Sequence, residues 1–164
     1  MIQNLAHQQM AIDTLCKALQ DDIPEVRSKA AESLGKLNVE AAVPALVTLL
    51  NDPDPRVRLS TIQALGQLRS EAAIPLLIPV LDDPDPTLRA AAVEALGQIG
   101  NEQVNTYLEK SLSDRDPNVR AIAAHALGQI GSEDVIPALI QALDDPEDRV
   151  RYRAVEAIGK IGTR

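Results

Sequence analysis

Apolar residues recur along the chain at helical spacing, in a pattern that returns every 31 residues. In residues 55–68 the apolar positions fall three or four residues apart, which places them on one face of a helix. Residues 41–51 carry a second apolar face of the same kind, so each unit predicts two helices. The positions on the two faces are Val43, Leu46, Val47, Leu49 and Leu50, then Val57, Thr61, Ala64, Leu65 and Leu68.

Five columns of residues keep the 31-residue step with no insertion. They are an aspartate, an aliphatic residue followed by arginine, and an aliphatic residue followed by glycine. A fixed period of this length is the signature of a repeat architecture. The columns are Asp21, Asp52, Asp83, Asp114, Asp145; Val26, Val57, Leu88, Val119, Val150; Arg27, Arg58, Arg89, Arg120, Arg151; Leu34, Leu65, Leu96, Leu127, Ile158; and Gly35, Gly66, Gly97, Gly128, Gly159.

The period predicts one domain over residues 1–164, made of five helix pairs. The repeats cover about residues 10–37, 41–68, 72–99, 103–130 and 134–161, and residues 1–9 are expected to lengthen the first helix. Aspartate and proline between the helices are typical of turns. Glycines of the fixed column lie near a helix end, where we predict close approach of another helix. A C-cap role is the alternative, which the apolar pattern disfavours because it continues past the glycine to Leu68. A second glycine follows in the later units and is the better C′ candidate: Gly100, Gly131, Gly162.

The repeated pattern is well seen from Asp85-Pro86 through Leu88-Arg89 and Ala92 to Ala95-Leu96-Gly97 and Ile99-Gly100. It resembles the HEAT-like repeat of the phycobilisome-lyase type, over essentially the whole chain. The resemblance implies an all-α fold, a right-handed α-α superhelix (solenoid) of HEAT-like helix pairs. It also implies a structural ladder, in which each arginine hydrogen-bonds aspartate carboxylates of its own and the neighbouring repeat. The ladder residues are Asp52, Arg58, Asp83, Arg89, Asp114 and Arg120.

Catalytic chemistry finds little support in the sequence. The repeated aspartate and arginine favour a structural role, because an active site needs only one copy. Deoxyhypusine hydroxylases, a HEAT-like family, bind two irons through repeated His-Glu pairs, but neither His7 nor His125 is followed by glutamate. Cys16 lies among leucines and is expected to act as a small hydrophobe. We therefore expect no catalytic residue, no metal and no cofactor.

Charge and composition disfavour other classes of partner. A formal net charge of -8 with almost no aromatic residues disfavours nucleic acid and anionic membranes. No signal peptide or bilayer-spanning apolar run is recognisable, so we expect a cytoplasmic protein. One basic cluster, Arg149, Arg151 and Arg153, is expected to pair with its acidic neighbours Asp144, Asp145 or Glu147.

Several columns on the second helix of each unit vary between repeats. Second helices line the concave side of α-solenoids, which is their usual docking surface. Apolar residues at positions predicted to be exposed favour a partner-binding role there, and a merely solvated surface is the alternative. His125 shares a column with Gln63 and is predicted to face solvent. The predicted concave binding residues are Arg56, Leu59, Gln63, Glu94, Ile122, His125, Tyr152 and Arg153.

These patterns predict a non-catalytic scaffold that binds a protein partner on its concave surface. The resemblance leaves an alternative: a subunit of a bilin lyase, or a phycobilisome-associated factor that holds phycobiliprotein or bilin. An engineered consensus scaffold is a third interpretation, which the irregular differences between units disfavour.

The two ends of the chain differ. Polar residues crowd the first helix, as in a terminal cap. The final helix repeats the internal apolar pattern, which predicts either self-association through the C-terminal repeat or a longer protein from which this chain is cut. The apolar positions of that helix are Val150, Ala154, Val155, Ala157, Ile158 and Ile161.

Overall fold

The computed structural model describes residues 2–163, with side chains from residue 6 onward, and these residues form helices and no strand. The α-helices are α1 Ile2–Ala18, α2 Pro24–Leu37, α3 Val43–Val47, α4 Pro55–Gln67, α5 Ile74–Leu77, α6 Pro86–Ile99, α7 Asn105–Ser111, α8 Pro117–Ile130, α9 Ile136–Gln141 and α10 Asp148–Gly162. Short 3-10 helices are η1 Glu40–Ala42, η2 Thr48–Asn51, η3 Glu71–Ala73, η4 Ile78–Asp82, η5 Glu102–Val104, η6 Glu133–Val135 and η7 Ala142–Asp144.

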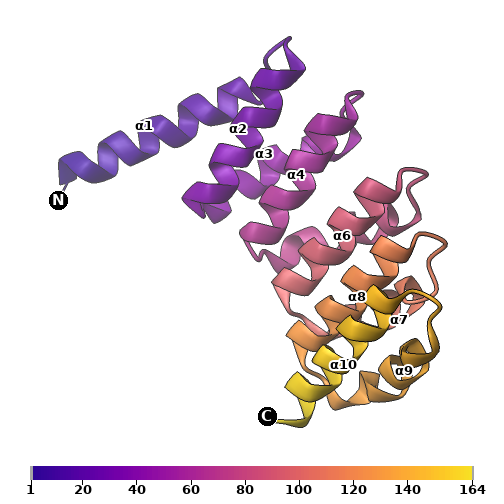
Figure 1. Ribbon diagram of the computed structural model, residues 1–164. Helices are drawn as coiled ribbons and strands as arrows, with labels where there is room; N and C mark the ends of the chain where they lie inside the picture. The colour runs from indigo at the N-terminus through magenta and orange to yellow at the C-terminus, as the bar shows by residue number, and fades with distance from the viewer. Residues whose placement is uncertain (1, 164) are drawn as a thin grey trace.

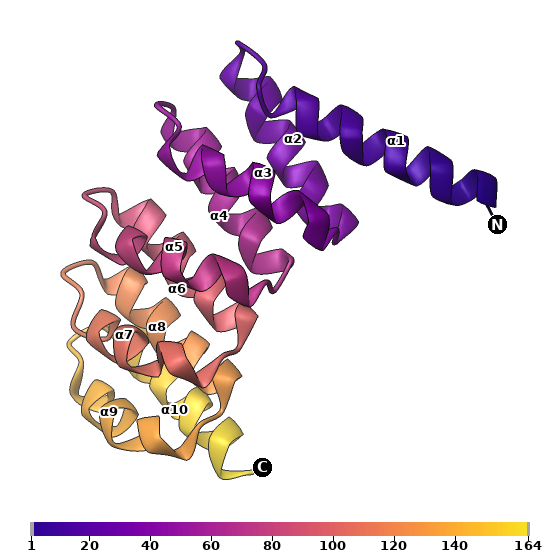
Figure 2. The same cartoon turned by 180° about the vertical axis from the view of Figure 1, so that it is seen from behind.

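The helix pairs stack into a curved solenoid (Figures 1 and 2), so the predicted all-α solenoid is confirmed. Helices α2, α4, α6, α8 and α10 pack side by side along the inner side of the curve. The shorter helices α3, α5, α7 and α9 lie on the outer side. Helix α1 is 17 residues long and reaches beyond the stack, and residues 2–9 do lengthen it. None of the helices described is long and apolar enough to span a bilayer.

The outer segments depart from the prediction of one continuous helix over residues 41–51. The structure divides this stretch into η1, the five-residue α3 and η2. Pro44 lies in the first turn of α3. It has no N–H to donate to the carbonyl of Glu40, and the preceding turn has the tighter 3-10 pattern. The fourth repeat has the same turn at η5 with Thr106 in place of the proline, so the turn does not require proline. The outer helices are short, and the inner helices carry most of the helical length.

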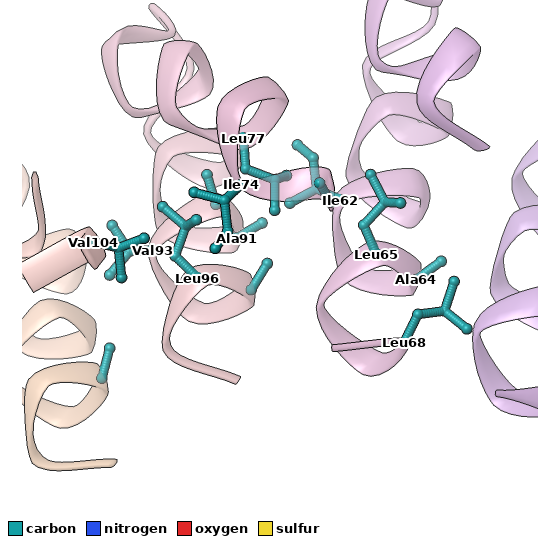
Figure 3. Packing of buried hydrophobic residues seen from close by; sticks show 14 of the residues in the cluster. Ile62, Ala64, Leu65, Leu68, Ile74, Leu77, Ala91, Val93, Leu96 and Val104 are labelled. Atoms are coloured by element: carbon teal, nitrogen blue, oxygen red, sulfur yellow. The ribbon is translucent and has the colours of Figure 1, made fainter. Parts of the chain in front are cut away.

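The core is a continuous column of aliphatic side chains between the inner and outer helices (Figure 3). Leu65 and Leu96 of the inner helices are fully buried, as are Leu77 and Val104 of the outer segments. Because no large aromatic ring enters this core, neighbouring helices pack through small and branched side chains only. The column runs through successive repeats without interruption, which makes the inner face a stable platform.

Glycines of the fixed column lie where neighbouring inner helices approach closely, as predicted. A Cβ atom added to Gly66 would lie 2.7 Å from the Cα atom of Ala95, far inside van der Waals contact. The same approach joins each inner helix to the next one. The corresponding contacts are Gly35 with Ala64, Gly97 with Ala126 and Gly128 with Ala157.

The second glycines end two helices in the left-handed conformation, as predicted. Gly100 and Gly131 have φ of 76° and 80° at the C-caps of α6 and α8. The prediction is wrong for Gly162, which is the last residue of α10. This helix extends one residue further than α6 and α8 do in their repeats, and Thr163 takes the C-cap position.

Replacing Gly66 by alanine is expected to lower the free energy of unfolding by about 1–3 kcal/mol, because the added methyl group meets the backbone of α6. Gly159→Ala is the matched control. Nothing lies within 4 Å of a Cβ atom at Gly159, so alanine there should raise stability by up to about 1 kcal/mol through helix propensity. Urea denaturation measures both, and equal effects would contradict the close-packing role.

Candidate functional site

Bidentate arginine–aspartate pairs connect successive repeats. Arg89 donates from Nε and Nη2 to the two carboxylate oxygens of Asp114, at 2.9 and 2.8 Å. The forked guanidinium matches the carboxylate, which makes such pairs specific in geometry as well as strong. We call each pair a rung. The other two rungs are Arg27 with Asp52 and Arg120 with Asp145.

Within its own repeat each ladder arginine binds backbone rather than carboxylate. Nη1 of Arg89 donates to the carbonyl oxygens of Asp83 and Pro84, at 2.9 and 3.2 Å. The carboxylate of Asp83 instead accepts the backbone N–H of Asp85 in the turn. The expected carboxylate contact within one repeat is therefore wrong. In a rung the carboxylate accepts its own turn N–H and is bound by the arginine of the preceding repeat, as at Asp114.

The rung between the second and third repeats is not formed. Arg58 donates from Nη1 to the carbonyl oxygens of Asp52 and Pro53, at 2.8 and 3.3 Å. Among the described residues, Arg58 and Asp83 make no ion pair with each other. Of the six predicted ladder residues, the structure thus places four in rungs and leaves this pair apart.

The rungs shift the acid–base equilibria of their aspartates. The hydrogen bond from Arg27 holds the pKa of Asp52 below its ordinary value, and that from Arg120 does the same for Asp145. A carboxylate with a lowered pKa in the folded state stabilises the fold at pH above its unfolded pKa. This contribution is lost as the pH falls from about 4 through the folded pKa.

Five of the predicted binding residues meet in one hollow of about 480 Å³ on the concave side. They come from three successive inner helices, Glu94 from α6, Ile122 and His125 from α8, and Tyr152 and Arg153 from α10. The side chain of Tyr152 is 66% exposed. The other residues that line the hollow are Asn118, Ala121, Ala126, Gln129 and Arg149.

The remaining three predicted residues lie elsewhere on the inner helix α4. Arg56 forms ion pairs with Glu25 and Asp54, both at 2.7 Å. Gln63 lines a separate, more polar hollow shared with α2 and α6. Leu59 was expected to be exposed, but it is half-buried and packs against the core. Ile122 is also half-buried, although it still faces the hollow.

Glu156 lies close to two residues that line the hollow, Arg153 and His125. Its carboxylate accepts a hydrogen bond from Nη1 of Arg153 at 2.7 Å, which lowers the pKa of Glu156. Nδ1 of His125 lies 3.8 Å from the same carboxylate. Burial, and then the positive charges of Arg153 and Lys160, lower the pKa of His125. His125 was expected to face solvent, but its side chain is only 32% exposed.

Arg149 and Asn118 belong to the hollow and were not among the predicted binding residues. Both occupy the column of Arg56, so stepping along that column by 31 residues would have found them. Arg149 has no ion pair or hydrogen bond among the described residues, and its guanidinium is open to a ligand.

The expected pairing of the basic cluster with Asp144, Asp145 or Glu147 is also corrected. Arg153 pairs with Glu156, and Arg151 binds the carbonyl oxygens of Asp145 and Pro146. These acidic residues precede the helix in the turn, whereas the arginines point along its inner face or back to the turn backbone.

The hollow combines an exposed aromatic ring, an aliphatic side chain and an unpaired guanidinium. The guanidinium of Arg153 lies 5.8 Å from the ring centre of Tyr152, within the range of a cation–π contact. Within residues 2–163 no group of three or more His, Cys, Asp and Glu side chains is arranged to hold a metal ion. The arrangement can provide contact surface and hydrogen-bond donors to a ligand.

A curved stack of helix pairs with a hollowed inner face defines a helical-repeat solenoid. The sequence matches the HEAT repeats family over residues 1–58, 43–114 and 106–164, and the chain belongs to this family. No curated protein matches the sequence.

Solved structures show the same stack. The complex of CpcE and CpcF of phycocyanin lyase from Nostoc sp. PCC7120 contains a chain 28% identical to this one, with a TM-score of 0.81. The match covers 93% of this chain and 65% of that chain, so this protein spans about two thirds of its length.

Two more distant structures share the fold alone. A designed armadillo repeat protein in complex with the peptide (KR)4 is 22% identical, with a TM-score of 0.73, covering 98% of this chain and 85% of that one. Human deoxyhypusine hydroxylase is 18% identical, with a TM-score of 0.52, covering 93% and 85%.

Arg89→Ala is expected to lower the free energy of unfolding by about 1–3 kcal/mol, because Asp114 loses its donors while partly buried. Arg58→Ala is the matched control, since Arg58 makes the same carbonyl contacts but no rung. Thermal and urea denaturation should show a clearly smaller loss for Arg58→Ala. Equal losses would mean that the rung adds nothing to the backbone contacts.

The pKa of His125 is expected to lie below 6.5 in the folded protein and to rise in Arg153→Gln. This change removes a nearby positive charge and leaves Glu156 free to stabilise the imidazolium. An NMR titration of the imidazole carbon-bound protons, assigned with His125→Gln, measures both values. A pKa that stays unchanged in Arg153→Gln would show that the two side chains do not interact.

Proposed function

We propose that this protein is a non-catalytic scaffold that binds a protein partner through the hollow on α6, α8 and α10. The observation that carries the proposal is the grouping there of exposed Tyr152, half-buried Ile122 and unpaired Arg149. Tyrosine and arginine dominate binding energy at protein interfaces, and they act best beside apolar side chains that exclude water.

The distribution of charge favours the C-terminal half of the concave face, rather than the N-terminal half, as the surface that binds the partner. Near α2 and α4 the charged groups already satisfy one another: Arg56 pairs with Glu25 and Asp54, and Glu32 with Lys29 and Lys36. In the hollow, Arg149 and the side chain of Asn118 remain available to a ligand. The partner that fits is a segment with an acidic group for Arg149 and an apolar side chain for Ile122 and Tyr152.

An assisting subunit of a bilin lyase is the second candidate, favoured by the 28% identity and TM-score of 0.81 with the phycocyanin lyase chain. Under this alternative the partner is a phycobiliprotein, or a second lyase subunit, and a bilin can be held as well. An absorbance titration with free bilin and a binding assay with phycocyanin test it directly. No spectral change and no binding to phycocyanin would reject the lyase alternative and leave the general scaffold. We expect either form to act in the cytoplasm.

A photo-crosslinking amino acid at Asn118, in the hollow, is expected to capture a discrete protein from an extract of cells that express the gene. The same group at Tyr107, on the outer helix α7, is the control and should not capture that protein. Mass spectrometry of the crosslinked band identifies the partner.

Binding to the captured protein should weaken at least tenfold in Arg149→Glu, about 1.4 kcal/mol, since a donor becomes a repelling acid. Lys110→Glu, on the outer side, makes the same change of charge and should leave the affinity unaltered. Isothermal titration calorimetry measures both. Equal affinities for the two variants, or capture from Tyr107 alone, would place the binding surface elsewhere.

A further inference from the structure

The last inner helix presents a face that the described chain leaves uncovered. Ala31, Ile62, Val93 and Ala124 occupy one column and are fully buried against the next repeat, but Val155 in the same column is 60% exposed. The glycine column behaves alike: four members touch an alanine of the next helix, and Gly159 has nothing within 4 Å. We call the surface of Val155, Ile158 and Gly159 the C-terminal face.

The first inner helix leaves a matching face open. Val26 is 37% exposed, whereas its equivalents Val57, Leu88, Val119 and Val150 are fully buried by the preceding repeat. Helix α1 does not fill this space, and a hollow of about 330 Å³ remains between α1 and α2. We call the surface of Val26 and Ser33, flanked by Leu15 and Ala18, the N-terminal face; buried Ala30 lies at the bottom of its hollow.

The two faces are complementary in register. Inside the stack each glycine meets the residue 29 positions later, as Gly35 meets Ala64 and Gly128 meets Ala157. The column of Ala64 begins at Ser33, whose side chain is also small. A second copy placed one repeat further along would therefore bring its Ser33 against Gly159, with both backbones free to approach.

The charges at the two faces are complementary as well. Arg151 donates from Nη1 to the carbonyls of its own turn, and its Nε and Nη2 have no carboxylate partner within residues 2–163. Asp21 begins the aspartate column, and its carboxylate accepts only the N–H of Ile23 among the described residues. These are the donor and the acceptor of one further rung, from Arg151 of one copy to Asp21 of the next.

We propose that the C-terminal face of one copy binds the N-terminal face of a second copy, head to tail, so that the solenoid continues across the junction. The contact joins two different surfaces, so each bound copy offers a free face to another and assembly grows with concentration. The proposal does not depend on the partner of the concave hollow, because Val26, Val155 and Gly159 lie outside that hollow.

Single glutamates in each face give a sharp test by analytical ultracentrifugation. Wild type should gain mass with concentration, beyond a dimer, whereas Val26→Glu alone and Val155→Glu alone should stay monomeric. A mixture of the two variants should form a dimer and stop there, because one intact face of each kind remains. Leu76→Glu, at an exposed apolar position of the outer helix α5, is the control and should assemble like wild type. Circular dichroism verifies that all variants are folded.

Each other outcome overturns the proposal. If the wild type is monomeric at every concentration, the proposed head-to-tail contact does not form. If Val26→Glu alone forms a dimer, two C-terminal faces pair with each other instead. Register is tested in a Cys16→Ser background by mixing chains that carry only Lys29→Cys with chains that carry only Tyr152→Cys, because the equivalent residues inside the stack, Ser28 and Ser60, place their hydroxyl oxygens 2.7 Å apart. A disulfide between the two kinds of chain is expected under oxidation. Assembly without this disulfide would contradict the continued register.

Discussion

The close approach of neighbouring inner helices is the constraint on which the rest of the structure depends. Glycine on one helix and alanine on the next let the two backbones meet where any larger pair would clash. Close approach of this kind leaves no room for even one added methyl group, because protein interiors are packed to crystal density. The 31-residue period repeats this approach at every step, so that α2, α4, α6, α8 and α10 lie side by side.

Both the rungs and the hollow follow from that spacing. A guanidinium that is held by two carbonyl oxygens of its own turn reaches the next aspartate only if the two turns are one helix spacing apart. The hollow has the same origin, since Ala121 and Ala126 on α8 are small enough to leave space that larger side chains at its rim then surround. The inner helices thus supply a rigid frame, and the variable columns supply the chemistry that faces a ligand.

Sequence periodicity predicts most of the fold, because every repeat offers the same apolar and glycine positions to its neighbours. It does not predict features that depend on the detailed stacking of two repeats. Arg58 and Asp83 belong to the same columns as Arg89 and Asp114, yet only Arg89 and Asp114 form a rung, while Arg58 binds the carbonyl oxygens of its own turn. The partial burial of Leu59 likewise follows from its packing against the core. The hollow itself depends on how α6, α8 and α10 pack together, whereas Arg149 could be found from the sequence by following the column of Arg56.

The absent rung divides the stack into unequal blocks. Arg27 ties the first repeat to the second, and Arg89 and Arg120 tie the last three together, but no such tie crosses from α4 to α6. In a repeat protein each unit contacts only its neighbours, so total stability is a sum of unit and junction terms. The junction with the fewest polar ties is where partial opening costs least. We expect slow amide exchange to reveal two cooperative units that meet there, which would make the crescent a hinged rather than a uniformly stiff frame.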